Sequence, residues 1–129
     1  MRIIGGKFRS RVLAEFDGED VRPTSDRVKE SLFNILSLKM YGARVLDLFS
    51  GSGALGLESL SRGAGEVCFN DCAKTSIAIL KKNLTALKIV PNGNEAKVKT
   101  QMTVECEVEV KKINGTWQIS ELDIKGSNI

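Results

Sequence analysis

The feature that most constrains this chain is a glycine-rich turn between an apolar run and a helical pattern. Within residues 45–56, Gly51, Gly53 and Gly56 fit the pattern G-x-G-x-x-G. This pattern lets a backbone turn tightly beneath a bound nucleotide, although an ordinary glycine turn fits it equally well. Asp71 follows Gly51 at the spacing where a second strand ends and a carboxylate meets ribose hydroxyls. The stretch therefore predicts a nucleotide-type site.

Asp47 narrows the class of ligand expected at this turn. It lies four positions before Gly51, inside an otherwise apolar strand. A pyrophosphate on the adjacent helix N-terminus would be repelled by this carboxylate. S-adenosylmethionine has no phosphate and carries a sulfonium and an amino group, which a carboxylate suits. The alternative interpretation is an Asp that caps the following turn. We favour the S-adenosylmethionine interpretation.

Composition excludes several classes of protein. The 129 residues suit one modest domain, and no run approaches the roughly 18 apolar residues that span a membrane. The start of the chain lacks the apolar core of a signal peptide, so we expect a cytoplasmic location. Three cysteines without any histidine make a metal site or a disulfide framework improbable. A general base would have to be a carboxylate, a lysine or a backbone group.

The first 22 residues form a basic segment. Four of its cations precede the first acid, Glu15, and these are Arg2, Lys7, Arg9 and Arg11. Such an arm commonly contacts nucleic-acid phosphates, although a merely solvated terminus is the competing interpretation. Short apolar pieces broken by glycines predict a small hairpin or a loosely held arm.

An amphipathic helix is predicted after Pro23. Thr24 or Ser25 is the expected cap, and Asp26 falls in the first turn. One apolar face follows, made by Val28, Leu32, Ile35 and Leu36. The charged side chains are expected away from this face: Arg27, Lys29 and Glu30.

A βαβα unit is predicted next. Residues 44–49 and 66–70 read as buried strands, and residues 54–62 and 73–87 read as helices. Alternation of this kind predicts an α/β fold with a parallel, doubly wound sheet. The loops after both strands should meet at its carboxyl edge, where ligands bind in such folds.

The pattern changes near residue 95. Even positions from Val98 to Val110 are largely apolar, which predicts one long antiparallel strand with a wet face. Asn114-Gly115 then signals a hairpin. In the returning strand the apolar positions change from odd-numbered to even-numbered residues, which predicts a bulge near Ser120-Glu121. A two-stranded ribbon is marginal alone in water, so residues 98–124 are a candidate surface for self-association.

Three motifs in order resemble the RsmD-type 16S rRNA (guanine-N(2))-methyltransferases. They cover residues 1–9, 22–36 and 46–64, and residues 69–71 and 81–84 continue the likeness, which spans about residues 1–95. The resemblance implies a truncated Rossmann-like class I S-adenosylmethionine-dependent methyltransferase fold. It also implies methyl transfer to the exocyclic N2 of a guanine in 16S rRNA of the small ribosomal subunit.

The resemblance also implies roles for particular residues. Those implied around the methionine part of the cofactor are Asp47, Phe49, Gly51, Ser52 and Gly53, with Asp71 at the ribose. Those implied in RNA binding are Arg2, Lys7, Arg9, Arg11, Arg22, Thr24 and Arg27. No membrane or metal partner is implied.

The sequence departs from this family at the residues that handle the substrate. Such enzymes use an Asn/Asp-Pro-Pro-aromatic turn to position the amine and stack the base. This chain has only Pro23 and Pro91, so no catalytic residue is assigned. The alternative function is therefore a non-catalytic module that binds S-adenosylmethionine or RNA, or an interaction module that uses the hairpin.

Three parts of the chain are expected. Residues 1–22 form the basic arm, residues 23–95 form the first part of the cofactor-binding domain, and residues 96–129 form a hairpin tail. The tail does not match the motifs of the methyltransferase family and is weakly similar to the last hairpin of NTF2-like or lipocalin-like domains.

Overall fold

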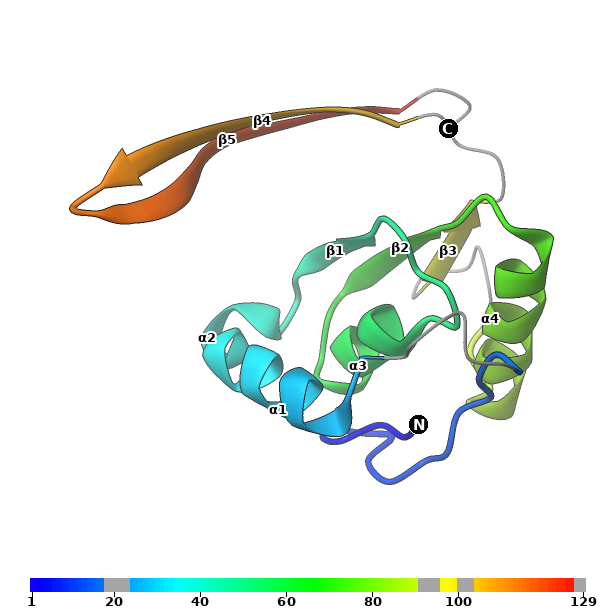
Figure 1. Cartoon of the computed structure of the whole chain (residues 1–129). Coiled ribbons are helices and arrows are strands. Elements are labelled where there is room, and N and C mark those ends of the chain that lie inside the picture. The colour runs from blue at the N-terminus through cyan, green and yellow to red at the C-terminus, as the bar shows by residue number, and fades with distance from the viewer. Residues whose placement is uncertain (18–23, 91–95, 100–103, 127–129) are drawn as a thin grey trace.

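The computed structural model describes residues 1–17, 24–90, 96–99 and 104–126 (Figure 1). A short parallel sheet is combined with helices, and a long hairpin follows it. The elements in order are α1 (Asp26–Ile35), α2 (Ser37–Met40), β1 (Arg44–Asp47), α3 (Ala54–Ser61), β2 (Glu66–Asn70), α4 (Lys74–Ala86), β3 (Ala96–Lys99), β4 (Val104–Ile113) and β5 (Thr116–Gly126).

The sheet has three parallel strands in the order β1-β2-β3. The predicted βαβα unit is confirmed, since α3 connects β1 to β2 and α4 follows β2. The third strand corrects the expectation of one long antiparallel strand from Val98 to Val110. Val98 instead pairs with Phe69 in the parallel ladder, and the antiparallel strand begins at Val104. Alternating apolar and polar residues indicate that one face of a strand is exposed to solvent, but they do not identify the neighbouring strand.

The core lies where α3 and α4 pack on the sheet. Its fully buried apolar side chains include Leu57, Val67, Phe69, Leu80 and Leu84. Gly56 sets the distance between α3 and β2, because a Cβ there would lie 2.2 Å from Phe69 Cε1. The third glycine of the motif therefore serves close helix–strand packing.

The predicted orientation of α1 is wrong. Lys29 and Phe33 are buried, whereas Val28 is 56% exposed and Ile35 is 80% exposed. Lys29 Nζ donates to the carbonyl oxygen of Arg2 at 2.5 Å. Burial lowers the pKa of Lys29, and the nearby Glu58 carboxylate opposes that shift. The N-terminal segment beneath α1 supplies the acceptor that lets a lysine face inward.

The N-terminal segment forms a small hairpin, one of the two predicted alternatives. The Ile3 amide donates to Arg11 O at 3.0 Å, and the Ser10 amide donates to Ile3 O at 2.8 Å. Ile3 and Leu13 are buried in the main core. The segment is therefore part of the folded domain.

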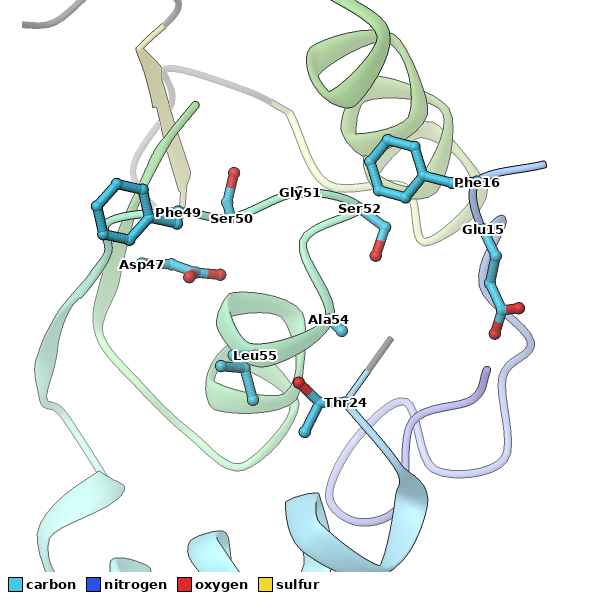
Figure 2. Close-up of a pocket in the computed structure, with 10 residues that line it drawn as sticks. All are labelled: Glu15, Phe16, Thr24, Asp47, Phe49, Ser50, Gly51, Ser52, Ala54 and Leu55. Atoms are coloured by element: carbon cyan, nitrogen blue, oxygen red, sulfur yellow. The ribbon is translucent and has the colours of Figure 1, made fainter. Parts of the chain in front are cut away.

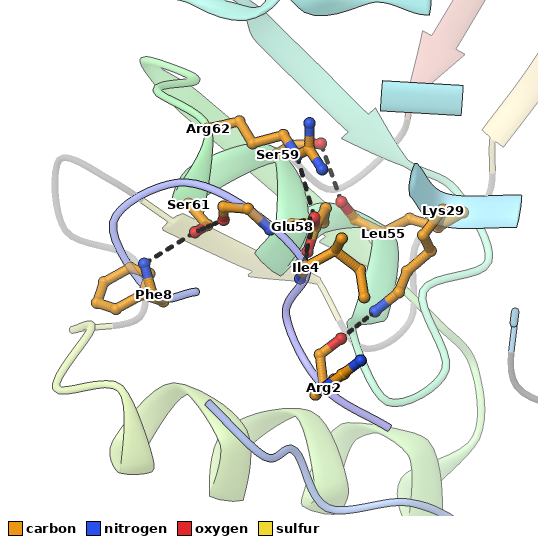
Figure 3. A network of polar contacts seen from close by, with 10 residues as sticks. Arg2, Ile4, Phe8, Lys29, Leu55, Glu58, Ser59, Ser61 and Arg62 are labelled. Atoms are coloured by element: carbon orange, nitrogen blue, oxygen red, sulfur yellow. Dashed lines mark hydrogen bonds and ion pairs between the residues drawn. The ribbon is translucent and has the colours of Figure 1, made fainter. Parts of the chain in front are cut away.

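Glu58 of α3 fastens this segment to the domain (Figure 3). Its fully buried carboxylate accepts hydrogen bonds from the amides of Ile4 at 3.0 Å and Gly5 at 3.1 Å. Arg62 Nε donates to the same carboxylate at 3.0 Å, and its guanidinium lies 5.4 Å from the Phe33 ring centre. One carboxylate thus links the N-terminal segment, α3 and, through Arg62, α1.

The last two strands, β4 and β5, pair with each other in antiparallel fashion. Asn114 and Gly115 form the turn with φ values of 52° and 81°, as a type I′ hairpin requires. Between Glu109 and Val110 the register shifts, which leaves Ser120 as the extra residue, where the change of parity places a bulge. Self-association through this ribbon stays a prediction.

Within the described ranges, no helix is long and apolar enough to cross a membrane.

Replacing Glu58 tests its role in stability. Glu58→Gln keeps the volume but places an amide donor among amide and guanidinium donors, so we expect the free energy of unfolding to fall by about 3 kcal/mol. Urea denaturation measures this loss. Glu30→Gln, at an exposed position on α1, is the control and should change stability by less than about 0.5 kcal/mol. Equal effects of both substitutions would contradict the anchoring role.

Candidate functional site

A pocket opens at the carboxyl end of β1 (Figure 2). The glycine loop and the first turn of α3 form one side, and the N-terminal segment and Thr24 contribute the other. Its lining residues are Glu15, Phe16, Thr24, Asp47, Phe49, Ser50, Gly51, Ser52, Ala54 and Leu55. A cavity therefore lies at the carboxyl edge of the parallel sheet, where the sequence predicts a ligand site.

Asp47 is the buried acid of this pocket. It ends β1, and its Oδ2 accepts the Gly56 amide hydrogen bond at 3.0 Å. Burial raises the pKa of Asp47 above its ordinary 3.8, the Gly56 hydrogen bond opposes the rise, and the charge of Asp71 adds to it. Asp47 therefore caps the first turn of α3 and also lines the pocket, and its contact with a cofactor stays a prediction.

The glycine loop has the conformation that the motif requires. Gly51 and Gly53 have φ values of 55° and 89°, in the left-handed region that favours glycine. A Cβ at position 53 would also lie 2.4 Å from Leu80 Cδ1. The Gly53 amide closes the turn by donating to Ser50 O at 2.8 Å. The Gly53 backbone therefore packs against α4 where a side chain would not fit, and Gly53 is not one of the pocket-lining residues.

Asp71 braces this loop from the end of β2. Its Oδ2 accepts from the Gly51 amide at 2.9 Å, and its Oδ1 accepts from the Ala73 amide at 2.9 Å. Asp71 is not one of the pocket-lining residues. The sequence correctly brings Asp71 beside the glycine loop, and contact with a ribose stays a prediction.

Two further predicted cofactor residues line the same pocket. Phe49 is 86% exposed, so its ring is available as an apolar wall. Ser52 is buried, and its carbonyl accepts from Asn83 Nδ2 at 2.9 Å. The Ser50 hydroxyl is buried and has no hydrogen-bond partner among the described residues.

Sequence reasoning missed the contribution of the N-terminal segment to the pocket. Glu15 and Phe16 line the cavity, and Glu15 also pairs with the N-terminal amine of Met1. The adjacent Ala14 is held by Asn83, whose amide both donates to and accepts from its backbone. No local pattern identifies these residues, because only the tertiary contact with α4 places them there.

The predicted RNA-binding residues have different surroundings. Arg2 pairs with Asp26 at 3.1 Å, Arg11 donates to Ala86 O at 2.8 Å, and Lys7 lies over the Phe8 ring. Three more are described only by their position: Arg9 and Arg27 are exposed, and Thr24 lines the pocket. Arg22 lies outside the described residues.

The chemistry of the lining residues tests the expected cofactor. The lining carries two acids, Glu15 and Asp47, and none of its described members is basic. A ligand with a cationic group fits this set better than a pyrophosphate. The cavity measures about 150 Å³, below the roughly 300–1,000 Å³ of a complete small-molecule site, so it suits one part of such a ligand.

The three-stranded parallel sheet with a glycine loop and an acid at its carboxyl edge defines a Rossmann-like α/β architecture. More narrowly, the chain belongs to the family described as Conserved hypothetical protein 95, whose family model matches residues 1–116. The match extends beyond residue 95, where the likeness was expected to end, and includes β3 and β4.

Named relatives support the resemblance seen in the sequence. The chain is 45% identical over 105 residues to Ribosomal RNA small subunit methyltransferase D of Haemophilus influenzae, covering 81% of this chain and 53% of that protein. The Escherichia coli protein of the same name is 48% identical over 88 residues, covering 68% of this chain and 44% of its own length. The RsmD-type resemblance is confirmed. The chain spans about half the length of the curated relatives it matches.

Solved structures agree with this assignment. The Escherichia coli protein yhhF is 46% identical with a TM-score of 0.67, covering 78% of this chain and 52% of that one. A hypothetical protein of Thermus thermophilus is 32% identical with the same TM-score, covering 78% and 55%. The fold therefore matches theirs over most of this chain.

The buried acid of the pocket leads to a pH-dependent prediction. Because the folded-state pKa of Asp47 is raised, the folded chain holds a proton that the unfolded chain releases near pH 3.8, and this contribution to stability is lost as pH rises through the folded pKa. Asp47→Asn removes that loss and keeps an acceptor for Gly56. We expect the ligand-free variant to be more stable than the wild type at neutral pH, with the difference shrinking as pH falls from the raised folded-state pKa toward 3.8 and absent below it. Chemical denaturation across this range measures it, and a wild type that is as stable or more stable at neutral pH would contradict the prediction.

Proposed function

We propose that this chain binds S-adenosylmethionine in the Asp47 pocket. We further propose that it provides the cofactor-binding part of a methyltransferase acting on the exocyclic N2 of a guanine in 16S rRNA. The observation that carries the proposal is the buried Asp47 carboxylate in a pocket whose described lining has no basic residue. A carboxylate in that position favours a positively charged ligand group.

Each part of the cofactor has a suitable group in the chain. The amino group and sulfonium would face Asp47, while the exposed Phe49 ring and the Gly51 backbone offer apolar and close contacts. The ribose hydroxyls would reach Asp71, whose oxygens retain acceptor capacity beyond the Gly51 and Ala73 hydrogen bonds. When bound, the cofactor supplies an electrophilic methyl group on sulfur.

The proposed substrate rests on the relatives and on the charge of the chain. Relatives at 45% and 48% identity are named as methyltransferases of small-subunit ribosomal RNA. The N-terminal segment carries four cations and leads directly to the pocket wall at Glu15. RNA phosphates on this segment would bring a guanine toward the methyl group.

The residues of this chain would act by positioning. Methyl transfer to a guanine amine is a displacement in which the N2–C bond forms as the S–C bond breaks, and the amine then loses a proton to solvent or a base. Asp71 and Asn70 hold the glycine loop in place through hydrogen bonds at 2.9 Å. A fixed loop would hold the cofactor in one orientation for transfer of its methyl group.

Cofactor binding tests the proposal directly. We expect calorimetry to detect S-adenosylmethionine binding, and Asp47→Asn to weaken it about tenfold or more, because loss of a charge partner costs roughly 1.5–3 kcal/mol. Asp71→Asn should weaken it as well, while Glu30→Gln should leave it unchanged. No binding to the wild type, or equal affinity for NAD, would overturn the proposal.

The proline content of the chain favours a second function, a module that binds cofactor and RNA without catalysis. The two prolines, Pro23 and Pro91, are not adjacent, so the Pro-Pro turn that holds a target amine is not encoded in these 129 residues.

Methyl incorporation separates the two functions. With the pure chain, labelled S-adenosylmethionine and 16S rRNA, we expect little or no transfer of label, because no turn positions the amine. Reactions without RNA supply the background. Robust turnover would reject the non-catalytic function and show that other residues position the guanine.

A further inference from the structure

Two stretches of the described chain each carry four basic residues and no acid. Residues 1–14 carry four cations, and residues 72–90 carry Lys74, Lys81, Lys82 and Lys88. Aspartate and glutamate occur between these stretches, from Glu15 to Asp71. The second stretch consists mainly of α4, to which neither the sequence nor the pocket assigns a role.

The fold places these two stretches side by side (Figure 1). The Ala14 amide donates to Asn83 Oδ1 at 2.6 Å, and Asn83 Nδ2 donates to Ala14 O at 3.1 Å. Nearer the end of the helix, Arg11 Nη2 donates to Ala86 O at 2.8 Å. An arginine at a helix C-terminus is favoured by the helix dipole and leaves its other donors free to bind elsewhere.

The lysines of α4 continue the same charged surface. The three lysines of α4, and Lys88 just beyond its end, are exposed. The opposite face of the helix is buried through Ile77, Leu80 and Leu84. Lys82 lies one helical turn before Ala86, hence on the side that Arg11 reaches. Lys74 and Lys81 are two turns apart and share a face. No ion pair joins these lysines to an acid within the described ranges.

An unneutralised row of this kind favours a polyanion. Its cations repel one another in the free protein, and each one that meets a phosphate releases a counterion. We propose that α4 and the N-terminal segment form one continuous surface that binds the phosphate backbone of the RNA substrate. Arg11 joins the two halves. The inference rests on the proposed function, which supplies RNA as the partner.

Paired charge removal tests the surface on α4. The test variant is Lys81→Gln/Lys82→Gln, and the matched control is Lys39→Gln/Arg44→Gln. The control removes two exposed cations from α2 and β1, on the other side of the molecule from α4 in Figure 1. Binding to naked 16S rRNA is measured by filter retention across a salt series, and S-adenosylmethionine binding by calorimetry verifies the folded pocket in each variant.

The expected result is selective. The α4 variant should bind RNA about tenfold more weakly, and its slope of log affinity against log salt should be shallower by about 1.5, since each lost phosphate contact removes roughly 0.7–0.9. The control should match the wild type, and cofactor binding should be unchanged in both variants.

Other outcomes would overturn the inference in distinguishable ways. If wild-type RNA binding is strong and both variants keep it, or lose it equally, α4 is no RNA surface and the proposed function stands. A wild type that binds the cofactor but no RNA removes the RNA substrate from the proposed function and the inference with it. Equal competition by duplex DNA would reject RNA as the specific partner of this surface.

Discussion

The buried carboxylate of Glu58 is the interaction on which the rest of this structure depends. It binds the amides of Ile4 and Gly5 and the Arg62 side chain, and so fixes the N-terminal segment on α3. From that anchor the chain continues to Glu15 and Phe16, which complete the pocket wall. The same anchoring lets α1 bury Lys29 against the Arg2 carbonyl. A single buried acid therefore organises the pocket as well as the core.

The acid in the pocket, Asp47, and the acid beside the glycine loop, Asp71, have different tasks. Asp47 is buried at the end of β1, where burial raises its pKa, so a cationic group beside it would stabilise the charged carboxylate. Asp71 uses both oxygens to accept backbone amides, which fixes the glycine loop against the end of β2. In the proposed function, the fixed loop would give backbone contacts to the ligand, and the buried acid would give the charge that selects it.

Much of this site follows from the sequence, because its determinants are local. The spacing of Gly51, Gly53 and Gly56 dictates the turn and the close approach of α3 to Phe69, and the structure has both. The bulge at Ser120 followed from a change of parity. The α1 face and the strand at Val98 were wrong, since an apolar stripe or an alternation does not specify which neighbour covers it.

The sequence by itself determined the βαβα order, the glycine turn, the acids beside it and the family, because each depends on residues close together along the chain. Only the tertiary structure decided that Lys29 faces inward and that Glu15 and Phe16 line the pocket. It alone placed Arg11 against the end of α4. These contacts join segments dozens of residues apart. They arise when buried donors and acceptors must find partners, a condition that no local pattern expresses.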